Sequence, residues 1–266
     1  MKVCAFGNSY MIAIKDAIED SALNGSVTFV GGPAGKWSVS VAGDAVKPGP
    51  NALLFFAEGK GPDILLSDYD AFLIVGLRLS FQLATKIYRR HRLWHHAAKD
   101  HHIISEKALH SAITDQLSQT LAVDLARSLR QHTDKPIFLI PQPNPIEEIK
   151  SLALTTDKLK DTYERWQVFF QDEIAIEGYS AFVRAAEAIA TDLSAKFLPQ
   201  PEDTMTPVFS NNLYRVELKP KYEPGDRIPR RPNDMLHLNP LFGHCVVKQI
   251  EPLLAVASRT ESISAA

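Results

Sequence analysis

Short apolar segments alternate with longer amphipathic ones along this chain, and this alternation restricts the fold more than any other feature. Four apolar segments have the length of β-strands, at residues 2–6, 27–30, 69–75 and 136–140. The third is continuously apolar from Ala71 to Val75, as in a strand that is covered on both faces. The alternation predicts an α/β fold, a three-layer sandwich with a central, mostly parallel sheet between two layers of helices.

Apolar residues at helical intervals mark the segments between and after these strands. We expect helices over residues 10–20, 105–131, 179–196 and 244–257, and helical structure in parts of 82–102 and 147–178. We expect residues 36–62 to be irregular, with an edge hairpin around 53–56, and a short strand at 216–218. The sequence thus predicts a single domain over residues 1–266, with a helical and irregular insertion around 147–232.

Composition excludes several classes of protein. The chain has 266 residues, of which 45% are hydrophobic and 23% are charged, and its net charge is −2, so we expect neither a nucleic acid nor a membrane as partner. The first apolar segment is too short for a signal peptide core, which predicts a cytoplasmic protein. Cys4 and Cys245 both lie in apolar segments, and we expect two free thiols, although a disulfide between them stays open.

The loops that follow the strands are the expected place for a site, because parallel sheets bind ligands at the carboxyl ends of their strands. By this reasoning residues 7–9, 31–35, 76–80 and 141–145 line one crevice. Asn144 lies in the last of these loops and is a candidate for contacting a substrate, although an Asn between prolines is first of all a turn residue.

Ser9 is the candidate nucleophile. It follows the first strand within Gly7-Asn8-Ser9 and opens a helix, whose free backbone N–H groups favour negative charge. A serine hydroxyl needs a base to remove its proton, a group to orient that base, and donors for the oxyanion that forms. The competing interpretation of Ser9 is a helix N-cap.

Asp234-Met235-Leu236-His237 supplies a candidate base and a group to orient it. An Asp three residues before a His on one loop can bind the imidazole Nδ1, and Nε2 then faces the nucleophile. His244 is a rival base but lacks an Asp at this spacing. The competing interpretation is that Asp234 caps the last helix and that His237 has no role.

These two motifs together resemble those of the SGNH (GDSL-like) hydrolases. The resemblance implies a flavodoxin-like sheet, with Ser9 as nucleophile, His237 as base and Asp234 as its orienting acid. It also implies that the backbone N–H groups of Ser9 and Gly35 bind the oxyanion. The family's next block is a Gly-x-Asn after the third strand, and here Gly76 is followed by Arg78 at the position of the Asn.

The resemblance predicts a serine hydrolase that cleaves an ester without metal or organic cofactor. Its substrate would be a small-molecule or carbohydrate ester, such as an O-acyl or O-acetyl sugar. Three alternatives stay open: an acyltransferase on the same site, a non-catalytic binding module, and a metal-dependent enzyme that uses the His-rich residues 89–102. For those residues a solvated basic face is the favoured interpretation. The segment 147–232 could form a lid or the surface of a homodimer.

Overall fold

The computed structural model describes residues 1–19, 26–32, 39–48, 64–96, 99–151, 157–216 and 234–264. Its centre is a five-stranded sheet in the spatial order β2-β1-β6-β9-β10, and every neighbouring pair is parallel. The strands are β1 (Lys2–Gly7), β2 (Ser26–Gly31), β6 (Ala71–Val75), β9 (Ile137–Ile140) and β10 (Lys196–Phe197). The predicted α/β architecture with a parallel central sheet is confirmed, and β10 is a strand that the sequence did not indicate.

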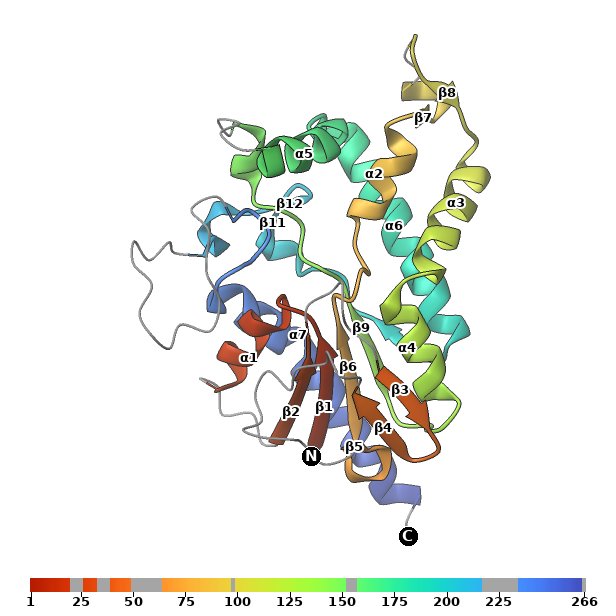
Figure 1. Cartoon of the computed structure of the whole chain (residues 1–266), viewed down its shortest axis with the longest axis vertical. Helices are drawn as coiled ribbons and strands as arrows, with labels where there is room; N and C mark the ends of the chain where they lie inside the picture. The colour runs from red at the N-terminus through yellow and green to blue at the C-terminus, as the bar shows by residue number, and fades with distance from the viewer. Residues whose placement is uncertain are drawn as a thin grey trace.

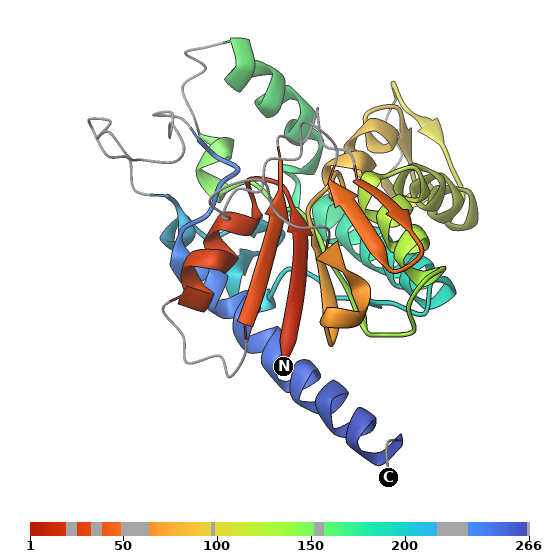
Figure 2. The ribbon, with the colours of Figure 1, turned by 60° about the horizontal axis from the view of Figure 1, so that its bottom comes forward.

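Helices cover both faces of this sheet (Figure 1). One face carries α1 (Met11–Glu19) and α7 (Pro240–Ser264). On the other face, α4 (Leu121–Arg130) and α6 (Asp172–Asp192) contact the strands, and α2 (Gln82–Tyr88) and α3 (Glu106–Ser118) pack on α6 in the same core (Figures 1 and 2). Strand β1 shows the division: Val3 and Ala5 join the core under α1 and α7, whereas Cys4 and Phe6 join the opposite core. Period-two alternation in a buried strand produces this split.

The strand order reverses direction between β1 and β6. The chain passes from β1 to β2 on one side and then crosses to β6 on the other, so β1 lies between the two. Such a reversal of direction is where open parallel sheets bind ligands, beyond the carboxyl ends of the strands. Gly7 pairs with Val75 at that end, so the loops that begin at Asn8 and Gly76 are neighbours.

A small antiparallel sheet corrects the expectation that residues 36–62 are irregular. It consists of β3 (Val39–Ala42), β4 (Ala45–Pro48) and β5 (Ile64–Leu65). The turn between β3 and β4 uses Gly43 at a φ of +59°, a conformation that glycine adopts without strain. The hairpin predicted at 53–56 lies outside the described residues. Of the strand predicted at 216–218, only Val216 is described, and it is not in a strand.

Two predicted helix boundaries were wrong because capping residues were overlooked. The single helix expected over 105–131 is two helices, since Thr120 caps α4 by accepting a hydrogen bond from the Val123 N–H. Helix α7 begins at Pro240 and not at His244. Asn239 caps it through the Phe242 N–H, and a proline at the first helical position is already in helical conformation.

The predicted insertion at 147–232 contributes to the main body. Helix α6 packs on the sheet and β10 extends it, and α5 (Asp157–Trp166) places Trp166 in the same core.

The remaining short elements are β7 (His91–Arg92), β8 (His102–Ile103), β11 (Met205–Thr206), β12 (Phe209–Ser210) and the 3-10 helices η1 (Leu66–Asp68), η2 (Trp94–His96), η3 (Glu147–Lys150), η4 (Gln167–Phe169), η5 (Glu202–Thr204) and η6 (Asn212–Tyr214). Both cysteines are free, as predicted. Among the described residues, no helix is long and apolar enough to cross a membrane.

Candidate active site

Ser9, His237 and Asp234 form a continuous chain of short polar contacts. The Ser9 Oγ lies 2.8 Å from His237 Nε2, and His237 Nδ1 lies 2.6 Å from Asp234 Oδ2. An ionised carboxylate can only accept, so Nδ1 carries the proton of the neutral imidazole and Nε2 accepts the Ser9 hydroxyl hydrogen. The structure therefore brings together three side chains from opposite ends of the sequence, in the order hydroxyl, imidazole, carboxylate.

The turn at the end of β1 sets the position of Ser9. Gly7 lies so close to β6 that a Cβ would be 2.9 Å from the Val75 carbonyl oxygen, so this approach requires glycine. The Asn8 carbonyl accepts the Met11 N–H at 3.0 Å, and its side-chain Oδ1 accepts the Tyr10 N–H at 3.3 Å, which starts α1. Ser9 thus stands at the helix N-terminus with its Oγ on His237. This contact favours the nucleophile interpretation over the N-cap interpretation.

The loop before α7 holds the acid and the base in one local structure. Asp234 Oδ1 accepts the backbone N–H groups of Leu236 and His237, each at 3.1 Å, and leaves Oδ2 for the imidazole. Because Asn239 caps α7, the interpretation of Asp234 as the cap of that helix is wrong.

These contacts keep the Asp234 carboxylate ionised. Burial alone would raise its pKa, but the hydrogen bond and charge of His237 and the N–H groups of His237 and Leu236 outweigh burial and lower the pKa to about 2. A charged Asp234 over a wide pH range holds the imidazole in one tautomer.

Asp234 should also make the fold sensitive to acid. Its pKa of about 2 in the fold, against 3.8 for an unperturbed carboxyl, corresponds to about 2 kcal/mol of stability. A lowered pKa stabilises the fold above pH 3.8, and this contribution is lost as the pH falls towards 2. We expect Asp234→Asn to lower the free energy of unfolding at neutral pH by up to this amount and to flatten its decline over that window. Urea unfolding at a series of pH values measures both effects.

Asp124→Asn is the matched control, since Asp124 forms an exposed ion pair with Arg127 and such pairs contribute little to stability. An Asp234→Asn variant that loses stability in acid as steeply as the wild type would contradict the prediction.

Tyr10 supports the imidazole from one side. Its ring stacks on that of His237, with the centroids 5.1 Å apart and the planes 19° from parallel. Burial, and secondarily the charge of Asp234, raise the pKa of Tyr10, so the phenol stays neutral beside the carboxylate. The stack and the bond to Asp234 together fix the plane and the direction of the His237 ring.

A second set of contacts connects the loop of residues 234–239, here called the acid–base loop, to the rest of the protein. The Ile146 N–H binds the Met235 carbonyl at 3.0 Å. The Asn239 N–H binds the Tyr214 carbonyl at 2.9 Å, and its side-chain amide donates to the carbonyls of Leu213 and Arg215. The loop is therefore held by η6 and by the segment before η3.

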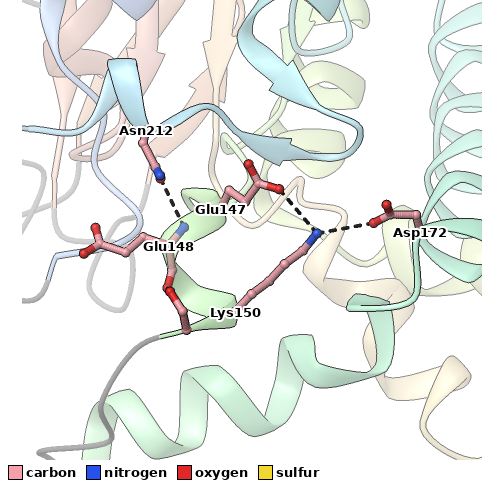
Figure 3. A network of polar contacts seen from close by, with 6 residues as sticks. Glu147, Glu148, Lys150, Asp172 and Asn212 are labelled. Carbon is pink, nitrogen blue, oxygen red and sulfur yellow. Dashed lines mark hydrogen bonds and ion pairs between the residues drawn. The ribbon is translucent and has the colours of Figure 1, made fainter.

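Figure 3 shows how η3 is anchored in turn. Lys150 lies between the carboxylates of Glu147 and Asp172, at 3.5 and 3.3 Å, and so joins η3 to the start of α6. The Asn212 side chain accepts the Glu148 N–H at 3.1 Å and joins η3 to η6. Exposed ion pairs of this kind add little stability, but together they fix the segments that carry the acid–base loop.

The other predicted site residues have different positions. Gly76 is buried beside the turn that carries Ser9, since a Cβ there would be 2.7 Å from Asn8 Oδ1. Arg78 is exposed, and Gly76, Leu77 and Arg78 have φ values of +72°, +46° and +69°. Two consecutive left-handed residues other than glycine are strained, and such strain concentrates at functional sites. Gly35 lies outside the described residues.

Asn144 has a structural environment. Its side-chain amide donates to the Val208 carbonyl, its N–H donates to Gln200 Oε1, and its carbonyl accepts the Ser210 hydroxyl. The residue is buried, and these bonds tie the loop after β9 to β12. A contact between Asn144 and a substrate stays a prediction, and this environment does not favour it.

Sequence reasoning overlooked Tyr10 and the supporting role of Asn239. Asn239 carries a readable signal, because an Asn directly before a proline is typical of a helix start. Tyr10 follows Ser9 directly, but no local pattern shows that its ring meets an imidazole from the far end of the chain.

Comparisons with protein-family models, curated proteins and solved structures found no match for this chain.

Proposed function

We propose that this protein is a serine hydrolase of the SGNH type that cleaves an ester with Ser9, His237 and Asp234. The observation that carries the proposal is the 2.8 Å contact between Ser9 Oγ and His237 Nε2, with Asp234 on the opposite nitrogen of the ring. An accidental serine–histidine contact would not need a carboxylate that is held by two backbone N–H groups and directed at Nδ1.

The reaction would proceed in two steps. Ser9 Oγ attacks the acyl carbon while His237 Nε2 takes the hydroxyl proton, and His237 then returns that proton to the departing alkoxide. Water attacks the acyl-Ser9 ester in the second step while His237 Nε2 takes its proton; the bond to Ser9 Oγ then breaks, His237 returns the proton to Oγ, and the acid is released. Asp234 stabilises the imidazolium that forms in each step.

Donors for the oxyanion come first from the start of α1. Among the described residues, the Ser9 N–H has no acceptor, and it lies at a helix N-terminus, which favours negative charge. We propose the Gly35 N–H as a second donor, following the resemblance. The exposed Arg78, two residues after Gly76 in the loop that follows β6, suits an anionic group of the substrate.

The sheet supports the finer fold assignment. Numbered along the chain, its five strands have the spatial order 2-1-3-4-5, which is the flavodoxin-like order. The resemblance of the two end motifs implies this order. Ser9 lies in the turn directly after the first strand, as the resemblance also implies. We propose a small-molecule or carbohydrate ester as the substrate class, because the site contains groups for acyl chemistry.

Labelling with a fluorophosphonate probe tests the proposal. An activated serine attacks the phosphorus and becomes covalently labelled, so we expect one adduct per chain, on the peptide that contains Ser9. Ser9→Ala should remove the label, whereas Ser105→Ala should keep it, because Ser105 Oγ only accepts the Ala108 N–H at the start of α3. A folded wild-type protein that is not labelled would instead support the non-catalytic binding module.

A further inference from the structure

The structure brings together two adjacent histidines and a distant glutamate at the end of α2. Glu177 Oε2 lies 2.7 Å from His95 Nε2 and 3.4 Å from His96 Nε2. His95 and His96 belong to η2, and Glu177 belongs to α6, 82 residues after His95. Each of the three side chains is partly exposed, so an ion from solution can reach them.

We infer that His95, His96 and Glu177 bind a zinc ion. Zinc takes imidazole nitrogens and carboxylate oxygens at about 2.0–2.2 Å in tetrahedral geometry, which separates neighbouring ligand atoms by about 3.3 Å. The three ligand atoms here lie within 4.8 Å of one another, so small side-chain rotations bring them to that separation. Three protein ligands leave a fourth position for water.

The surroundings of Glu177 orient its carboxylate for this role. The Tyr88 hydroxyl donates to Glu177 Oε1 at 3.0 Å, which directs Oε2 towards the two histidines. Hydrogen bonds of this kind to a ligating carboxylate are a regular feature of zinc sites. Arg92 interacts with Glu177 through its charge, and its repulsion of a divalent ion leads us to expect moderate affinity.

A bound ion would add a link between two parts of the fold that His95, His96 and Glu177 already bring into contact. The segment from β7 to β8 projects from the body at the far end of α2 (Figure 1). Within it, η2 touches α6 through the His95 and His96 contacts with Glu177. Zinc would fix this projecting segment to α6. The proposed hydrolysis uses other residues, so a result for or against the zinc site leaves the proposed hydrolysis untouched.

Calorimetric titration of the chelator-treated protein with zinc chloride tests the site. We expect one ion per chain for the wild type, and binding below detection for the His95→Ala/His96→Ala double variant. Glu177→Gln keeps an oxygen for Tyr88 and should lower the affinity strongly without changing the circular dichroism of the zinc-free protein. Zinc should also raise the thermal midpoint of the wild type and leave that of the double variant unchanged.

Two controls separate this site from other zinc-binding histidines. His132→Ala removes an exposed histidine after α4, and His237→Ala removes the imidazole next to Ser9; both variants should bind zinc as the wild type does. Equal affinity in the wild type and the double variant, or loss of binding in His237→Ala instead, would overturn the inference.

Trp94 provides a local signal. It is 76% exposed, and its ring lies 5.4 Å from that of His95, whereas Trp166 is buried. Copper(II) binds such sites at least as tightly as zinc and quenches nearby indole fluorescence. Quenching by copper should disappear in Trp94→Phe and in the double variant. In the wild type, added zinc should compete with copper for the site and reduce the quenching. Quenching of equal size in the double variant would contradict a copper ion bound at these histidines.

Discussion

The Ser9→Ala variant should hydrolyse p-nitrophenyl acetate about 10⁴- to 10⁶-fold more slowly than the wild type, measured as kcat. The variant loses the oxygen that lies 2.8 Å from His237 Nε2, so the covalent intermediate of the proposed mechanism cannot form. Asp234→Asn should lower kcat by about 10⁴-fold, because an amide in this position favours the wrong imidazole tautomer. Combining the two substitutions should add little further loss, since the residues act as a unit.

Ser105→Ala is the control for Ser9→Ala. It removes a serine from the start of a helix and should cost about 1 kcal/mol of stability with unchanged kcat. Far-UV circular dichroism verifies that each variant is folded. Turnover by Ser9→Ala within tenfold of the wild type would show that another group carries the reaction.

Gly243→Ala should lower the free energy of unfolding by about 3 kcal/mol or more and should reduce fluorophosphonate labelling at the same time. A Cβ on Gly243 would lie 1.9 Å from the Ala13 carbonyl oxygen and 2.9 Å from the Ala17 Cβ. The first obstacle is backbone in the middle of α1, which no side-chain rotation can remove. The two helices must therefore separate.

The loss of labelling follows from what these helices carry. Ser9 stands at the start of α1 and His237 lies just before α7, so moving the helices apart also breaks the 2.8 Å contact. Gly43→Ala is the control, since a Cβ there meets nothing within 4 Å and adds only left-handed backbone strain of about 1 kcal/mol. Urea unfolding and labelling, measured on both variants, should separate the two glycines clearly.

The sequence predicted the parts of the fold that local patterns encode. The continuous apolar segment at 71–75 identified a strand covered on both faces, and β1 and β9 were found within one residue of their ends. The order of the elements along the chain then predicted the parallel sheet, and the turns after β1 and β6 are neighbours as expected. The candidate triad could be named because both of its halves lie in short local motifs.

Other features depend on contacts between residues that are distant in sequence. Strand β10 has only two residues and exists because Phe197 pairs with β9, so no periodic pattern reveals it. The prediction of a single helix over 105–131 was wrong because Thr120 was interpreted as an interior residue, whereas its hydroxyl caps α4. Likewise, the sequence favoured a basic face over a metal site for the histidines of η2, because Glu177 approaches them only in the folded chain.

The separation of 228 positions between Ser9 and His237 has a consequence for synthesis of the protein. A ribosome makes the hydroxyl early and the imidazole late, and α1 has no α7 to pack against until almost the whole chain has emerged. Any product of premature termination before that point contains Ser9 without His237. Under the proposed mechanism such fragments should be inert towards esters, because activation of Ser9 would have to wait for the last helix and the loop before it.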